Sequence, residues 1–434
     1  MKILGLLLSF VFTSYLFSVP YFSRKYEISC SNCHTIAPDL NKKGEDFLRK
    51  GYKLEGKKDF EDKINIKDDF LYLSKAVPIS FLLDLKATAF EKMEFNDFNR
   101  EYEKKSKADF QFPYTFKLLS GGILYKNISY YLSYLKERSV YSSFLDFYLY
   151  IKLFNSFPLY LKFGQFPVSD QLFKSNLKEE ENDYNIFIES PNYSTTNLYY
   201  DRGIQFIYSK SNLDFIFGVY NGNNRFQFYM SSIVLPNPYN VPNVNEYIEY
   251  DYDYNKNYSF RIKKVFSNSG FGLFYYSGRD NWKITVFDGD YRQKWVKNKL
   301  YYIGFDFTTK IKEKIKINAQ YIERNDDNLS VSPYYYEYTY FKNSKLKGGF
   351  FEILFFPKRY EGNYVFYLLY NKGNSQLPEF TFYNRTQEYY ELDFSNISFG
   401  FNYLFSRNTK LLLEYRRNFK NELNKFTVGF LAFF

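Results

Sequence analysis

From residue 79 to its end, the chain repeats strand-length stretches in which apolar and polar residues alternate. The stretch over 79–90 shows the pattern: Ile79, Phe81, Leu83, Leu85, Ala87 and Ala89 against Ser80, Asp84, Lys86 and Thr88. The stretches over 301–308, 314–321 and 397–405 alternate in the same way. A period of two is that of a β-strand with different surroundings on its two faces. The chain is therefore predicted to be mainly β.

Composition decides what those two surroundings are. The chain has 48 Tyr and 51 Phe, yet beyond the first residues it has no apolar run of about 18 residues that would make a membrane-spanning helix. A soluble β-sandwich would also alternate, but it would not need so many aromatic residues on one face. An apolar face toward lipid and a polar face toward a wet lumen are typical of a transmembrane β-barrel of the outer membrane.

The pattern places about sixteen antiparallel strands. We expect them near 79–90, 108–120, 128–136, 143–153, 158–167, 203–209, 213–220, 257–265, 270–277, 299–309, 314–323, 346–357, 363–371, 390–405, 409–417 and 425–434. Short connections alternate with long ones, notably 168–202, 221–256, 278–298 and 324–345. Short periplasmic turns and long outer loops are typical of such barrels, and an even count places both termini on the periplasmic side. If 225–234 is also a strand, the count changes by two.

The last strand ends at Phe434 and is apolar at every second position, as the terminal strands of outer-membrane barrels are. At the other end, Lys2 precedes an apolar run that gives way to small and polar residues near Ser18. This is the layout of a secretory signal peptide over 1–18. A retained membrane anchor is the alternative interpretation.

The two cysteines of the chain lie in one motif, Cys30-Ser31-Asn32-Cys33-His34, which also contains the single histidine. Cys-x-x-Cys-His is the attachment signature of c-type haem. The two thiols add to the two vinyl groups of one porphyrin, and the adjacent imidazole ligates the iron. We therefore predict one covalent haem c on Cys30 and Cys33, with His34 as an axial ligand of its iron.

Other readings of the motif have less support. A redox Cys-x-x-Cys of the thioredoxin kind needs a βαβ context, which does not follow. A zinc site needs more ligands than two cysteines and one histidine. The net charge of +10 is spread along the chain rather than clustered, and with export it does not predict nucleic-acid binding.

Residues 19–75 form the predicted haem segment, and 76–434 the barrel. A helix is expected from Pro38 to Lys50, stopped by Gly51, with Gly44 allowing close approach on its apolar face. The apolar positions of that face are Leu40, Phe47 and Leu48. Because some sixty residues are few for an independent core, we expect the segment to plug the barrel lumen. Residues 56–75 read as a tether or a second plug segment.

The second axial ligand and the site of an external donor are less defined. Without another histidine, Met93 or Met230 of the barrel, another group or water would complete the iron's ligands. Two predicted outer loops carry acidic clusters that suit a hard cation, although such runs are usually solvated. The clusters are Glu179-Glu180-Glu181-x-Asp183, and Glu246, Glu249, Asp251 and Asp253. No catalytic residue is singled out.

The N-terminal region resembles a known family, the outer-membrane monohaem cytochrome c–porin fusions that oxidise ferrous iron at the cell surface. About thirty residues carry the resemblance: Phe22-Ser23-Arg24, Cys30-x-x-Cys33-His34, Pro38-x-Leu40, Gly44-x-x-Phe47 and Gly51-Tyr52. The barrel is similar in layout alone.

The resemblance implies an Fe(II)-oxidising cytochrome c. Extracellular Fe(II) would be the donor, and electrons would pass through the haem to a soluble periplasmic cytochrome. Two alternatives stay open. One is a haem-bearing porin with a different electron donor or acceptor, and the other is a diffusion porin with a structural haem plug.

Overall fold

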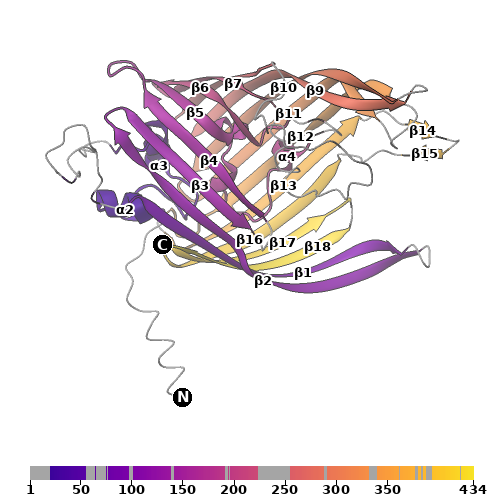
Figure 1. The fold of residues 1–434 in the computed structure, drawn as a ribbon. Helices are drawn as coiled ribbons and strands as arrows, with labels where there is room; N and C mark the ends of the chain where they lie inside the picture. Colours follow the sequence, from indigo (N-terminus) through magenta and orange to yellow (C-terminus); the bar gives the residue numbers. More distant parts are fainter. Residues whose placement is uncertain are drawn as a thin grey trace.

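The computed structural model describes residues 20–54, 64, 75, 77–96, 101–137, 141–190, 194, 196–222, 255–287, 291–331, 340–360, 362–376, 380–382, 385–387, 393–420 and 422–434. Its main element is a closed antiparallel barrel of sixteen strands, in which the first strand pairs with the last (Figure 1). The predicted fold class and strand number are confirmed.

The barrel strands follow one another around the wall with one short sheet interposed. They are β1 (Ile79–Asn96), β2 (Glu101–Tyr125), β3 (Ile128–Glu137), β4 (Tyr141–Lys152), β5 (Leu159–Pro167), β6 (Tyr200–Lys210), β7 (Leu213–Tyr220), β8 (Asn257–Phe266), β9 (Ser269–Phe287), β10 (Tyr291–Ile311), β11 (Ile315–Val331), β12 (Tyr340–Phe355), β13 (Tyr364–Gln376), β16 (Phe394–Ser406), β17 (Thr409–Asn418) and β18 (Leu423–Phe433). Between β13 and β16, β14 (Phe380–Phe382) and β15 (Arg385–Gln387) form a separate two-stranded sheet.

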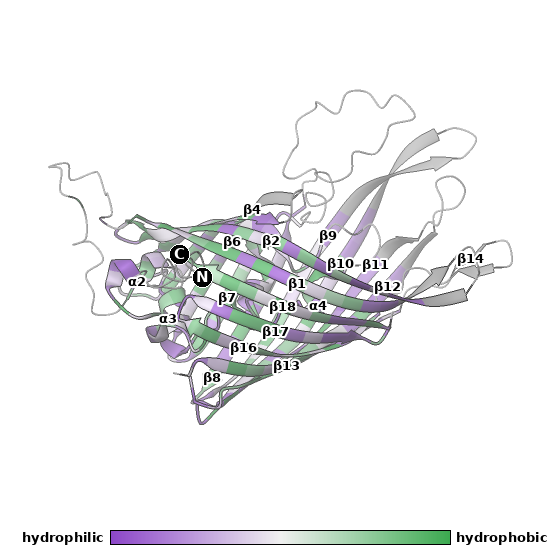
Figure 2. Ribbon diagram, turned by 90° about the horizontal axis from the view of Figure 1, so that it is seen from below, coloured by the Kyte–Doolittle hydropathy of each residue, from purple (hydrophilic) through white to green (hydrophobic). Residues whose placement is uncertain are grey.

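The alternation along the strands sorts side chains between the outside and the lumen. In β10, Ile303 and Phe305 are 54% and 47% exposed, whereas Asp306 is fully buried. Figure 2 shows the resulting bands of apolar and polar residues along the strands. An outer surface of exposed Phe, Tyr, Leu and Ile is unfavourable in water and favourable against lipid. The barrel thus presents a lipid-facing surface.

Two of the predicted long loops are not loops. The segments 278–298 and 324–345 are largely the arms of two hairpins, because β9 pairs with β10 through Phe287 and β11 pairs with β12 through Val331. Both segments begin with polar stretches, over 278–281 and 324–328, so the alternation by which a strand is recognised is interrupted there. The possible strand at 225–234 and the acidic cluster at 246–253 lie outside the described residues.

The chain before β1 lies at the end of the barrel where the short turns and the C-terminus are (Figure 1). It contains α2 (Pro20–Tyr26), the 3-10 turn η1 (Cys30–Asn32) and α3 (Lys42–Arg49). The backbone N–H of Tyr21 donates to Ser80 Oγ at 3.2 Å, and Arg24 donates to the Ile79 carbonyl at 2.7 Å. Among the described residues, no helix is long and apolar enough to cross a membrane. The predicted signal peptide lies outside them, as does most of the tether over 56–75.

The connection between β5 and β6 folds into the barrel instead of outward. This inward segment, residues 168–199, contains η2 (Val168–Gln171), η3 (Ser175–Leu177) and α4 (Asn185–Ile188), and α4 contacts β12 and β13. Tyr184 stacks on Phe350 of β12 with ring centroids 3.9 Å apart. The fully buried Arg324 of β11 donates to the Thr196 carbonyl at 2.7 Å and to Ser194 Oγ at 2.6 Å, which ties the end of the segment to the wall.

This placement corrects the expectation for the first acidic cluster. Glu179 and Glu180 are 1% and 5% exposed, so they are buried in the lumen and do not belong to an outer loop. A length of about 30 residues and an acidic run are typical of a solvated loop, but here buried lysines from the opposite wall offset the charge.

Candidate functional site

The Cys-x-x-Cys-His motif folds as a single tight turn. Ser29 caps the turn by accepting a hydrogen bond from the Ser31 N–H at 3.4 Å. The N–H groups of Cys33 and His34 both donate to the Cys30 carbonyl, at 3.1 and 2.9 Å. A 3-10 turn advances three residues per turn, so side chains three apart project from the same side. The turn therefore presents Cys30 and Cys33 together, and both line the same cavity.

His34 is held with one defined nitrogen toward the cavity. Its Nδ1 lies 3.1 Å from the carbonyl oxygen of Pro38. A carbonyl can only accept, so Nδ1 carries the proton and Nε2 keeps its lone pair. Burial lowers the pKa of His34, against the opposing effect of its hydrogen bonds to the backbone of Pro38 and Asp39, and thus favours the neutral imidazole. Neutral imidazole oriented by a carbonyl is the state in which histidine ligates a metal.

The two thiols are unbridged, and they differ in their exposure to water. Cys30 is 4% exposed and its Sγ lies 3.7 Å from Ser23 Oγ, while Cys33 is partly exposed. Burial and the neighbouring Cys30 raise the pKa of the Cys33 thiol, although Lys43 opposes the shift. Disulfide-exchange motifs instead lower the pKa of the attacking thiol. The electrostatics therefore do not favour the redox interpretation of the motif.

The helix after the motif begins later than predicted. Asn41 caps α3 by accepting from the Gly44 N–H at 3.0 Å, so the helix starts at Lys42 and ends at Arg49. Pro38 and Asp39 instead lie in a turn, after which Leu40 bridges back to His34. The Asn41 amide also donates to the carbonyls of Ser31 and Asn32, each at 3.1 Å. One side chain thus joins the motif to the helix, and the preference for Asn at N-caps was the signal for it.

Gly44 is where α3 touches the motif. A Cβ at this position would lie 2.1 Å from the Cys33 carbonyl oxygen and 2.9 Å from Leu40 Cδ2. Gly44 therefore allows a close approach to the backbone of the motif, while its predicted approach to a haem stays a prediction. After the helix, Gly51 adopts a positive φ of 65°, as expected for the residue that ends it.

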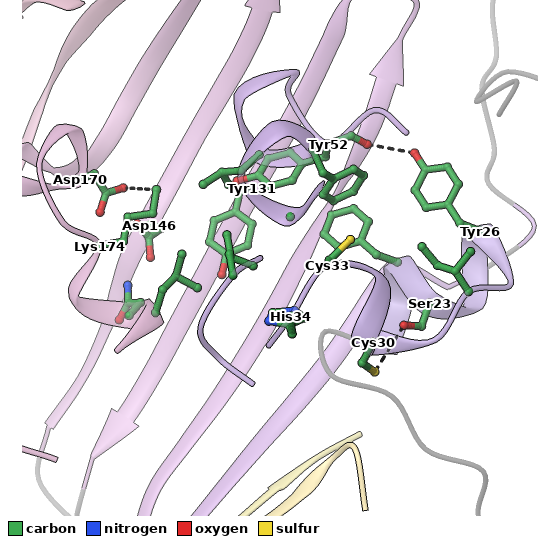
Figure 3. A pocket seen from close by; sticks show the side chains of 18 of the residues that line it. Ser23, Tyr26, Cys30, Cys33, His34, Tyr52, Tyr131, Asp146, Asp170 and Lys174 are labelled. Carbon is green, nitrogen blue, oxygen red and sulfur yellow. Dashed lines mark hydrogen bonds and ion pairs between the residues drawn. The ribbon is translucent and has the colours of Figure 1, made fainter. Parts of the chain in front are cut away.

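The motif opens onto a cavity between the N-terminal segment and the barrel wall, whose empty volume is about 910 Å³ with its solvent-open part included (Figure 3). Its walls are mainly aromatic and aliphatic: Phe22, Tyr26, Ile28, Leu40, Phe47, Leu48, Tyr52, Tyr131, Tyr148 and Leu177. Phe22 stacks on Tyr52 at 5.4 Å and Tyr52 on Tyr131 at 5.7 Å between ring centroids. Three of these residues, Leu40, Phe47 and Leu48, are the ones that the sequence placed together on one apolar face, and all three line the cavity.

A polar wall faces the motif across the cavity. Asp146 comes from β4, and Asp170, Lys174 and Asn176 come from the inward segment. Lys174 pairs with Asp170 at 2.7 Å. Burial raises the pKa of Asp170, but Lys174 and Lys162 outweigh burial and hold the pKa below its usual range. Sequence reasoning missed these residues, because their only signal was an inward position on a strand or a place in a connection.

The N-terminal segment is bonded to the lumen wall on several sides. Lys310 of β10 pairs with Glu45 at 2.9 Å, and Lys316 of β11 pairs with Asp39. Arg49 pairs with Asp214 of β7 at 3.3 Å, and its carbonyl accepts from the Tyr150 hydroxyl of β4 at 2.8 Å. Lys410 of β17 donates to the Ala37 carbonyl at 3.2 Å. The prediction that the segment plugs the lumen is confirmed, and ion pairs from the wall hold it there.

The arrangement can hold a flat, largely apolar group joined to Cys30 and Cys33, with one atom facing His34 Nε2. No methionine is among the described residues that line the cavity. Met230 and the side chain of Met93 lie outside what the structure describes, so either as a second axial ligand stays a prediction.

Comparisons with known proteins find similarity in three dimensions alone. No family model and no curated protein matches the sequence. In vitro folded OmpT, an outer membrane protein of Vibrio cholerae, is 10% identical, with 85% of this chain and 99% of that chain covered and a TM-score of 0.48. An anion-selective porin from Comamonas acidovorans is 8% identical over 82% and 99%, at 0.49. OprB of Pseudomonas putida is 8% identical over 82% and 94%, at 0.48.

Proposed function

We propose that this chain is an outer-membrane cytochrome–porin that oxidises extracellular Fe(II) and passes the electrons to periplasmic cytochromes. Its cofactor would be one covalent haem c, held by Cys30 and Cys33 and ligated by His34. The proposed activity is that of an Fe(II)-oxidising cytochrome c. Its partners would be outer-membrane lipid, Fe(II) outside and an electron-carrier cytochrome inside.

One observation carries the proposal. The two thiols and the Nδ1-protonated imidazole of the haem-attachment motif line a single aromatic cavity inside the lumen of a closed barrel. The residues present fit haem c in chemistry: two thiols on one side of a turn, an imidazole with a free lone pair, and apolar walls for a porphyrin. A zinc site or an exchange disulfide would not need a cavity of this size.

Each residue has a definite task in this site. Haem, when bound, would supply one-electron transfer. Cys30 and Cys33 would prevent its loss, and the Pro38 carbonyl would keep His34 Nε2 aimed at the iron. Phe22, Tyr52 and Tyr131 would exclude water from one side of the site. Surroundings of this kind set the reduction potential of a haem.

The barrel supports an outer-membrane location. Its outer face is apolar, and helical spans and closed barrels are the structures that satisfy backbone hydrogen bonds in lipid. The short turns and the C-terminus share one end, so the proposed orientation places this end in the periplasm. The haem then lies at the periplasmic end of a layer of hydrocarbon about 30 Å thick, which otherwise insulates the donor from the acceptor.

The diffusion-porin alternative fits the lumen less well. The described part of the N-terminal segment occupies the short-turn end of the barrel and the inward segment lies inside it, and each is bonded to the wall by buried polar contacts. A wide channel for small solutes needs an open lumen. A haem-bearing barrel with a different donor or acceptor is equally compatible with the cavity, and the choice of Fe(II) rests on the sequence resemblance.

The test is electron transfer across a sealed bilayer. The full-length protein, purified with its cofactor, is reconstituted into liposomes that contain ferricyanide, and Fe(II) is added outside. His34→Ala removes the iron ligand. Ser398→Ala is the matched control, because Ser398 is fully buried toward the lumen of β16 and its hydroxyl has no hydrogen-bond partner there.

We expect the wild-type protein and Ser398→Ala to reduce the enclosed ferricyanide, and His34→Ala to leave it oxidised. Heat-modifiable mobility in gels verifies that all three barrels have assembled. Transfer by His34→Ala at the wild-type rate would contradict the proposal. Free passage of small solutes without electron transfer would favour the porin alternative.

A further inference from the structure

The acidic run of the inward segment is mostly neutralised by lysines. Each of three carboxylates has its own cation, from the barrel wall or from the segment: Glu179 with Lys410 at 3.2 Å, Glu181 with Lys86, and Asp183 with Lys178 at 2.8 Å. Buried or half-buried carboxylates are normally paired in this way. These three groups are therefore explained by the packing of the segment.

Glu180 is the exception. Its side chain is 5% exposed, and neither carboxylate oxygen has a hydrogen-bond partner among the described residues. Its strongest charged neighbour is another acid, Glu352 of β12, which is 1% exposed. Glu352 accepts from the Tyr184 hydroxyl at 2.6 Å and from the Asn318 amide, both neutral donors. Two buried carboxyl groups thus lie together, and among the residues that the structure describes neither forms an ion pair with a lysine or arginine.

Such a pair needs a positive charge. Burial, followed by the nearby Glu352 carboxylate, raises the pKa of Glu180 well above its usual range, with Lys178 opposing the shift. Two adjacent buried carboxylates are stable when they share a proton or bind a cation. Carboxylates select hard divalent cations, and one or two of them suffice where other oxygen ligands complete the shell. No group of three or more acidic, histidine or cysteine side chains able to hold a metal occurs in the described part of the chain.

The pair lies close to the proposed haem site. Leu177 lines the cavity, and Glu180 follows it by three residues, so their Cα atoms are at most about 11 Å apart. Next to Glu180, Glu179 accepts from the N–H of Asp39 in the N-terminal segment at 3.4 Å. In both views, α4 lies in the middle of the barrel, between the N-terminal helices and the long hairpins (Figures 1 and 2). A cation that enters from the long-hairpin end would meet this pair before it reached the cavity.

We propose that Glu180 and Glu352 bind a hard divalent cation inside the lumen. This inference rests on the proposed function, in which the cation is the substrate Fe(II) held next to the haem. Fe(II) bound there would become Fe(III) by giving up one electron, and a haem held by Cys30, Cys33 and His34 would supply the one-electron acceptor, with the periplasmic cytochrome as the final acceptor. The Tyr184 hydroxyl beside Glu352 offers a neutral oxygen to the same cation. Iron is thus bound within the barrel, between the inward segment and β12.

The test measures cation binding without electron transfer. Mn²⁺ does not reduce the protein under these conditions, and its electron paramagnetic resonance signal reports the free ion. The full-length protein in detergent is titrated with Mn²⁺, as are Glu180→Gln and Glu352→Gln, which keep the shape and remove the charge. Glu181→Gln is the matched control, since it removes a carboxylate from the same segment that is already paired with Lys86 of β1.

We expect the wild-type protein and Glu181→Gln to bind one Mn²⁺ per chain, and Fe(II) to displace it. In each Gln variant, the half-saturating Mn²⁺ concentration should rise by about tenfold or more, which is about 1.4 kcal/mol or more. Equal binding by Glu180→Gln and the wild-type protein would overturn the inference. So would infrared spectra that show a protonated carboxyl unaffected by Mn²⁺, because the pair would then hold a proton alone.

The failure of this inference is separable from that of the proposed function. Haem attachment and its reduction by Fe(II) are read from the visible spectrum, and Mn²⁺ binding does not depend on either. If Fe(II) reduces the haem at the same rate in wild type and Glu180→Gln, the proposed function stands and this site falls. If haem is absent while Mn²⁺ still binds at the pair, the cation site stands and the proposed function fails.

Discussion

The substitution Gly44→Ala tests how the N-terminal segment is built. A methyl group there would lie 2.1 Å from the Cys33 carbonyl oxygen. The optimal separation of non-bonded heavy atoms begins at about 3.5 Å, so α3 must move away from the motif by roughly 1 Å. The carbonyl belongs to the backbone of a hydrogen-bonded turn, so it cannot move aside as the end of a flexible side chain would. The substitution therefore separates the helix from the motif.

The size of the effect follows from two opposing terms. Overpacking of a well-filled site costs about 1–3 kcal/mol. Replacing Gly by Ala stabilises a helix by at most about 1 kcal/mol. We expect a net loss of about 1–2 kcal/mol in docking of the segment, which is a factor of about 5–30 in the population of the detached form.

Trypsin measures that population, because α3 contains Lys42, Lys43 and Arg49, and cleavage follows the fraction that opens. Cleavage within α3 should be about 5–30 times faster in Gly44→Ala, while the heat-modifiable mobility of the barrel stays unchanged. Gly429→Ala is the control, because its Cβ would meet its nearest neighbour at 3.5 Å, an ordinary contact. Cleavage of Gly44→Ala at the wild-type rate would refute the argument from close approach.

Three further predictions concern the buried charges. Lys316→Met leaves the Asp39 carboxylate without its ion pair, which destabilises the docking of the segment by about 3–5 kcal/mol. Trypsin should therefore cut α3 faster than in Gly44→Ala, and slower cutting would contradict the role of the pair. Arg324→Met frees the end of the inward segment, and single-channel conductance in planar bilayers should rise; unchanged conductance would show that the segment is held elsewhere. Because burial and Glu352 raise the pKa of Glu180, protons compete with the cation, so Mn²⁺ affinity should increase with pH above the usual range of a glutamate and level off above the raised pKa. A decrease over the same range would exclude a role for Glu180 as a ligand.

The sequence predicted the barrel well, for a simple physical reason. Each strand that crosses the lipid must expose apolar side chains on one face and polar ones on the other, as Phe305 and Asp306 do. That requirement leaves a period of two in the sequence itself. Where it lapses, as over 278–281, backbone pairing alone continues the strand, and the sequence predicted a loop.

The candidate site was predicted in part. Cys30, Cys33 and His34 are adjacent in sequence, so their spacing alone identifies them. The opposite wall is made by Tyr131, Asp170 and other residues of the cavity far along the chain, and their position follows from barrel closure and from the inward fold of residues 168–199. No local pattern marks a connection that folds inward.

Glu179 shows why this connection was misjudged. It is held by Asn402 at 2.7 Å and by Lys410 at 3.2 Å, more than 200 residues later in the chain. In a single sequence these three residues read as an acidic loop and two ordinary lumen positions. Their meeting depends on the tertiary structure, which composition and periodicity do not record.

The central claim is that an electron from Fe(II) outside reaches a haem held by Cys30, Cys33 and His34 inside the barrel. The most direct measurement is a reduced-minus-oxidised absorption spectrum of intact outer membranes that contain this protein, recorded before and after addition of Fe(II). The account predicts that the bands of a reduced c-type haem develop rapidly after the addition, and that they are missing from membranes that contain His34→Ala. A spectrum without c-type haem, or an oxidised haem that Fe(II) leaves unreduced, would contradict it.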